Sequence, residues 1–253
     1  MKFLKAGLAV LMACVMLTGC GKKDLTEDEM KALFQETQTN MASLESSHLA
    51  LDAKLNISGS MLAQSGIDNT DMTMTLDMKY KDMNKQTMGL SGEYSIGIMG
   101  MNLTGSLYVK DEAMYIDLLG QKMKTPLDLS AFEIVEQPAN IDVSMLSNWT
   151  YEQADGLTFI SCDVDNDYFK SILDSLEEAS GSFKVNKLNF KYGITDDKYI
   201  SSVVISMDVE MTADGQSAVY AGEINITWDE HNKVSEITYP DLSNYQETEE
   251  SLF

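Results

Sequence analysis

Methionine is the residue type with the clearest chemical potential in this sequence, because its thioether is a soft ligand that suits Cu(I). Fifteen methionines follow residue 20, and ten of them lie between Met61 and Met123. In segment 71–80, apolar and polar side chains alternate as in a β-strand, and three of the apolar positions are methionine. Same-face neighbours on a strand are about 7 Å apart, too far for one pair to close easily around an ion. Copper is therefore disfavoured, and these methionines are interpreted either as packed core or as the wall of an adaptable apolar cavity.

The side chains that would line such a cavity are predicted from the alternation. These candidate ligand-facing residues are Met72, Met74, Leu76, Met78, Met88 and Met101. The pattern leaves open whether they touch a helix of the same chain or a lipid from outside, since methionine suits both surroundings.

The other reactive groups form no recognisable catalytic or metal-binding set. Segment 163–174 begins like a calcium loop, but Tyr168 replaces the glycine of its turn and Asp174 replaces its bidentate glutamate. It is interpreted as a strand end followed by a helix N-cap. Cys162 lies in an apparent strand, and a pairing with His48 or His231 stays open because such pairs meet only in space. We predict no enzyme, no catalytic residue, no metal and no cofactor.

The first 20 residues are typical of an export signal. "MKFLK" is basic, residues 6–17 are apolar, and "LTGC" ends at Cys20. The apolar run is too short to span a bilayer. The segment resembles the bacterial lipobox, which implies cleavage before Cys20 and a diacylglycerol on its sulfur. Two acyl chains give stable anchoring. We expect a signal peptide at 1–19, a lipidated cysteine with a short tether at 20–25, and a domain held at the extracytoplasmic face of the cell membrane.

The composition excludes several other classes. The formal net charge is −22, all 18 basic residues are lysine, and arginine is absent. Nucleic-acid binding is disfavoured because phosphate contact relies on basic patches. Cys162 is the one cysteine beyond the lipobox, so no intramolecular disulfide is expected.

Two periodicities predict the elements that position these residues. Thr26 and Glu29 form a capping box ahead of an apolar stripe, which predicts a helix over 26–45. A second helix is predicted over 165–179, and most other segments alternate with period two, as antiparallel strands do. The predicted fold is α+β: one large, curved, mainly antiparallel sheet, an open half-barrel, with both helices packed on its apolar face. It forms a single domain over 26–243, followed by an acidic flexible tail at 244–253.

This layout of lipobox, helix, long meander, mid-chain helix and further strands resembles the half-barrel lipoprotein and lipid carriers. These include the bacterial lipoprotein-localisation proteins and the mycobacterial lipid-binding lipoproteins. The methionine-rich strands and the run "AMYIDLLGQKMKTPLDL" look still more like a family of uncharacterised Gram-positive surface lipoproteins. In the carriers an apolar cavity between sheet and helices holds acyl chains.

The resemblance implies a non-catalytic lipoprotein that binds lipid, an acyl chain or another hydrophobic ligand and is attached to the membrane through its lipid. The alternative is a structural or protein-interaction lipoprotein whose sheet is filled by its own helices and binds no small ligand. The sequence names no protein partner.

Overall fold

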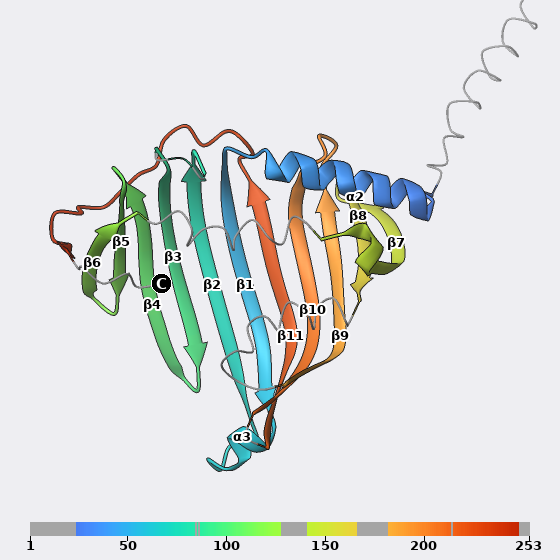
Figure 1. Ribbon diagram of the computed structural model, residues 1–253, viewed down its shortest axis with the longest axis horizontal. Helices are drawn as coiled ribbons and strands as arrows, with labels where there is room; N and C mark the ends of the chain where they lie inside the picture. Colours follow the sequence, from blue (N-terminus) through green and yellow to red (C-terminus); the bar gives the residue numbers. More distant parts are fainter. Residues whose placement is uncertain are drawn as a thin grey trace, which may run out of the picture.

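A single twelve-stranded sheet dominates the structure (Figure 1). The computed structural model describes residues 24–83, 85, 87–127, 141–165, 182–213 and 215–247. The strand order is β12-β6-β5-β4-β3-β2-β1-β11-β10-β9-β8-β7, and β12 against β6 is the parallel pair in an otherwise antiparallel sheet. The sheet is curved and does not close. The predicted α+β class with a large, mainly antiparallel open sheet is confirmed.

The chain builds this sheet as two meanders. The first contains α2 (Glu27–Ala42), β1 (Ser46–Ser58), α3 (Ser60–Ala63), β2 (Asn69–Lys81), β3 (Gly89–Ile98), β4 (Met101–Lys110), β5 (Ala113–Leu118) and β6 (Gln121–Pro126). The second contains η3 (Val143–Met145), β7 (Leu146–Ala154), β8 (Leu157–Val164), β9 (Ser182–Ile194), β10 (Ile200–Ala213) and β11 (Gln216–Asp229), with β12 (Gln246–Glu247) at the end. Pairing of β1 with β11 joins the two meanders at the centre of the sheet.

Helix α2 starts as the capping box predicts. The Thr26 hydroxyl accepts a hydrogen bond from the Glu29 amide, and the Glu29 carboxylate accepts one from the Thr26 amide at 2.7 Å. The helix buries Met30, Phe34 and Thr37 on one face. It ends at Ala42 and not at 45, because the Ser43 amide bonds the carbonyl of Asn40 in a tightened last turn.

Helix α2 lies across one end of the sheet, from β11 to the side of β7 (Figure 1). Met30 and Phe34 pack there with side chains of the apolar face, as predicted. The predicted second helix falls almost entirely on residues 166–179, which lie outside the described residues.

The two outermost strands are short or irregular. On one side β12 pairs with β6 over two residues, supported by an ion pair of 2.8 Å between Lys124 Nζ and Glu247 Oε1. These are described residues of the segment predicted as a flexible tail. On the other side, the register of β7 with β8 shifts between Ser147 and Thr150, and Asn148 has a φ of 53°.

Candidate ligand-binding face

The strand register sets the apolar positions of neighbouring strands side by side, in rows that cross the sheet. One row holds Met101, Ile98, Met72 and Leu55, on β4, β3, β2 and β1. The next holds Leu103, Ile96, Met74, Ala53, Ile224, Ile205, Phe190 and Cys162. A third holds Tyr94, Leu76, Leu51, Ile226, Val203 and Tyr192. Together these rows form one apolar face, and it carries four of the six predicted side chains at positions 72, 74, 76 and 101, with Met78 in the adjoining row.

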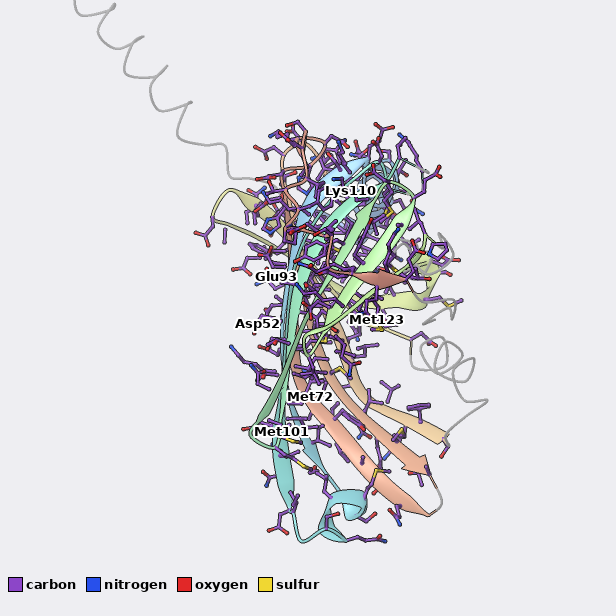
Figure 2. The ribbon with its side chains drawn as sticks, turned by 90° about the vertical axis from the view of Figure 1, so that its left-hand side faces the viewer. Asp52, Met72, Glu93, Met101, Lys110 and Met123 are labelled. Atoms are coloured by element: carbon purple, nitrogen blue, oxygen red, sulfur yellow. The ribbon has the colours of Figure 1, made fainter. Side chains whose placement is uncertain are left out.

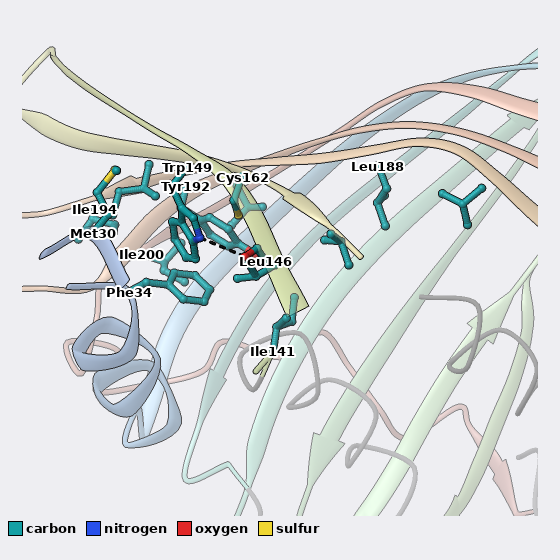
Figure 3. Close-up of a cluster of buried hydrophobic side chains, with 14 of the residues drawn as sticks. Met30, Phe34, Ile141, Leu146, Trp149, Cys162, Leu188, Tyr192, Ile194 and Ile200 are labelled. Atoms are coloured by element: carbon teal, nitrogen blue, oxygen red, sulfur yellow. Dashed lines mark hydrogen bonds between the residues drawn. The ribbon is translucent and has the colours of Figure 1, made fainter. Parts of the chain in front are cut away.

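The part of this face beneath α2 is closed by packing, and we call it the helix cluster. Phe34 is at its centre, with ring centroids 4.8 Å from Tyr192 and 5.8 Å from Trp149. Met30 joins from the same helix, and the Trp149 indole N–H donates to the Leu146 carbonyl at 3.2 Å (Figure 3). Aromatic pairs at such separations add to the stability gained from burial. This cluster fixes α2 to the sheet and leaves no accessible apolar surface under its central ring.

A second closed region, the meander cluster, lies on the first meander. It consists of Leu49, Met78, Tyr80, Met88, Leu90, Val109, Met114 and Ile116. Met78 is 7% exposed and Met88 is 2% exposed. These two predicted residues are therefore surrounded by side chains of their own protein.

The apolar face is less enclosed between the two clusters and the end of the sheet that carries α3, opposite α2. Met72, Met74 and Leu76 are each partly exposed. Met101, at the start of β4, is 67% exposed. Figure 2 shows Met72 and Met101 in the lower half of the sheet, and Ile98 lies between them in the same row. Of the six predicted residues, these four are the ones that a molecule from outside could touch.

The opposite face of the same strands is polar and carries an open groove of about 800 Å³. Small side chains at neighbouring positions form its floor and leave room for the groove: Ala50, Thr75, Ser95, Thr104 and Ser106. Four carboxylates line it, those of Asp52, Asp77, Glu93 and Asp117. Figure 2 shows Asp52 and Glu93 on the other side of the sheet from Met123. The sequence alone does not predict this groove, because its small residues become neighbours only through the strand register.

His48 partly offsets the negative charge beside this groove. Its Nδ1 lies 2.9 Å from Asp229 Oδ1, and its Nε2 lies 3.3 Å from Asp77 Oδ1. Burial by itself would lower the pKa of His48, but the hydrogen bonds to Asp229 and Asp77 outweigh it and raise the pKa above its usual value. The histidine therefore favours its charged form between two carboxylates from the neighbouring strands.

The remaining candidate groups are held in structural positions. Cys162 is fully buried on β8, and burial raises the pKa of its thiol to about 12, so the reactive thiolate is scarce at neutral pH. Asp163 accepts hydrogen bonds from Asn148 and Asn189, which ties it to the sheet. Residues 166–174 of the calcium-like segment lie outside the described residues. Within the described ranges, no three His, Cys, Asp or Glu side chains converge as metal ligands would.

Fold and face together define a class of protein: an open, curved antiparallel sheet with one continuous apolar face and one polar face. No helix among the described residues combines the length and the apolarity needed to cross a bilayer. The chain belongs to DUF6612, a family of unknown function whose model matches residues 29–244. No curated protein sequence matches it.

Solved structures provide three further comparisons. LprF from Mycobacterium bovis is 12% identical with a TM-score of 0.48, over 87% of this chain and 99% of its own. The lipoprotein LppX from Mycobacterium tuberculosis is 14% identical with a TM-score of 0.49, over 84% of this chain and all of its own. A DUF1329 family protein from Desulfovibrio piger is 11% identical with a TM-score of 0.27, over 82% of this chain and 94% of its own.

Proposed function

We propose that this protein is a lipoprotein, anchored through Cys20 at the extracytoplasmic face of the cell membrane, that binds a hydrophobic ligand such as a lipid or an acyl chain without catalysis. In this proposal residues 1–19 are removed as a signal peptide and residues 20–25 join the lipid to the domain.

The observation that carries the proposal is the partly exposed stretch of the apolar face. Met72, Met74 and Leu76 are flanked on both sides by apolar residues of adjacent strands. Neighbouring strands are about 4.8 Å apart, so the part of the second row outside the helix cluster, from Leu103 on β4 to Ile224 on β11, offers an apolar path of roughly 20 Å. Methionine side chains adapt to chains of varied shape. A path of this length and composition suits an extended acyl chain.

The test is native mass spectrometry of the protein purified from a lipid-containing host. We expect a stoichiometric lipid to co-purify. Met74→Lys places a charge on the apolar face and should abolish this occupancy. Thr73→Lys is the matched control, because the adjacent residue is exposed on the polar face of the same strand. Circular dichroism would verify that both variants keep the sheet.

Recovery of bare protein, even after lipid is supplied, would overturn the proposal. A second candidate, an interaction lipoprotein without a small ligand, would then be favoured. Its specific support is that Met78 and Met88 are already packed by their own chain.

A further inference from the structure

Three large apolar side chains are exposed among the described residues, and all three lie at turns between strands. They are Met99 at 45%, Met101 at 67% and Leu119 at 68%. Met99 and Met101 flank Gly100 in the turn between β3 and β4. Leu119 lies in the β5–β6 turn, beside the polar groove.

The β3–β4 turn lies in the most weakly charged part of the mature sequence. Residues 94–109 form the longest run without a charged side chain after residue 23, and residues 55–67 form the next longest. Both runs reach the same end of the sheet, since β1 and β3 point the same way. This end carries α3 and the β3–β4 turn, and it lies opposite α2 (Figure 1). We call α3 together with residues 98–101 the distal rim.

The distal rim is continuous with the candidate ligand-binding face. Met101 is opposite Ile98, and Ile98 is opposite Met72, so one apolar row leads from the exposed turn to the partly exposed methionines. Helix α3 adds Met61 and Leu62, both partly exposed. A lipid that entered along this row would meet apolar side chains from the first contact onward.

The chemistry and size of the rim favour a lipid surface over a protein partner. A stable protein interface buries about 800 Å² on each side, which a two-residue turn and one helical turn do not offer. Binding to a lipid surface scales with the apolar area that enters the acyl chains and needs no large complementary surface. The acidic body, with a net charge of −22 for the whole chain, would be repelled by anionic head groups, whereas the rim itself carries no charged side chain; the acidic residues nearest to it at this end are Asp68 and Asp71.

We propose that the distal rim docks on a lipid surface by inserting Met99 and Met101 between acyl chains, and that this is where a lipid ligand enters the apolar face. Because the tether 20–25 leads into α2 at the opposite end of the sheet, this lipid surface is a second one, distinct from the membrane that holds Cys20. The part concerning ligand entry rests on the proposed function, whereas the docking itself does not.

The test places a tryptophan at either end of β4 in the complete protein and adds vesicles whose acyl chains carry bromine, a contact quencher. Met101→Trp reports on the rim. Lys110→Trp is the matched control, because Lys110 is the exposed last residue of the same strand (Figure 2). The fluorescence of Trp149 and Trp228 in the unsubstituted protein is subtracted. We expect quenching of Met101→Trp and none of Lys110→Trp.

A further variant tests whether insertion depends on the apolar turn. Met99 and Gly100 have φ values of 52° and 74°, and Asp-Gly is a favoured pair for such a turn. Met99→Asp therefore keeps the turn while adding a charge. In the Met101→Trp background it should lower the quenching by up to about fivefold, because a charge near the lipid interface is unfavourable.

Two results would overturn the docking: equal quenching of Met101→Trp and Lys110→Trp, or quenching that Met99→Asp leaves unchanged. Native mass spectrometry of the same preparations separates the two proposals. Co-purified lipid without quenching would contradict the docking and support ligand binding. Quenching without co-purified lipid would support the docking and contradict ligand binding.

Discussion

At the scale of single residues, the buried thiol of Cys162 gives a direct test of the packing on β8. Burial raises the pKa of this thiol to about 12, and the side chain has no exposed surface. We expect iodoacetamide to leave Cys162 unmodified in the native protein and to alkylate it fully after unfolding in guanidinium chloride. Peptide mass spectrometry would locate the label. Rapid stoichiometric labelling without denaturant would contradict the packing of the helix cluster.

The two histidines are expected to titrate on opposite sides of pH 6.5. Hydrogen bonds to Asp229 and Asp77 raise the pKa of His48, whereas burial lowers the pKa of His231. The stability that His48 contributes is therefore complete below its unfolded pKa and is lost as pH rises through its folded pKa. For His231 the sign is reversed, and stability is lost as pH falls below about 6.5.

Nuclear magnetic resonance can follow both rings, since the chain contains only these two histidines. His48→Gln should remove the high-pH loss of stability and keep the low-pH loss, and His231→Gln should do the reverse. If both rings titrate with the same midpoint, the carboxylate contacts of His48 are not formed in solution.

At the scale of elements, α2 depends on one aromatic side chain. Phe34 is 1% exposed and contacts both Trp149 and Tyr192. Phe34→Ala should lower the free energy of unfolding by about 3–5 kcal/mol, because it removes buried area and leaves a cavity. Gln35→Ala, at the exposed neighbouring position, should change it by less than about 0.5 kcal/mol. Denaturant unfolding measures both, and equal effects would show that α2 does not depend on the helix cluster.

Elements that depend on neighbouring residues in the chain were predictable from the sequence. The capping box of Thr26 and Glu29 located the start of α2, and the alternation from Met72 to Tyr80 identified β2 and its two faces. Properties that depend on distant residues were not. The sequence around each strand does not indicate that β1 pairs with β11, or that Ser95 and Thr104 become neighbours on the floor of a groove. The exposed fraction of each methionine depends on these pairings as well, so Met72 and Met78 looked alike in the sequence.

At the scale of the whole molecule, the proposed lipid anchor can be tested by a single substitution at Cys20. Cys20→Ala removes the sulfur that would carry the diacylglycerol, and without two acyl chains the protein should be released into the medium. Cell fractionation and the mass of the released chain measure this outcome. Cys162→Ala is the control, because it also removes a thiol and should leave the protein at the membrane. Retention of the Cys20→Ala variant would contradict the lipobox interpretation.

The two edge strands of the sheet, β12 and β7, determine whether neighbouring copies of the protein can pair edge to edge. An open sheet presents unpaired backbone groups at each edge, and these are templates for pairing with another chain. Here Gln246 and Glu247 pair along β6 at one edge, and the shifted register near Asn148 interrupts the ladder at the other. An anchor in a membrane would confine copies to two dimensions, where edge-to-edge encounters are frequent. Loss of the ten C-terminal residues 244–253 would leave the edge of β6 exposed, so that separate molecules could pair edge to edge into continuous sheets.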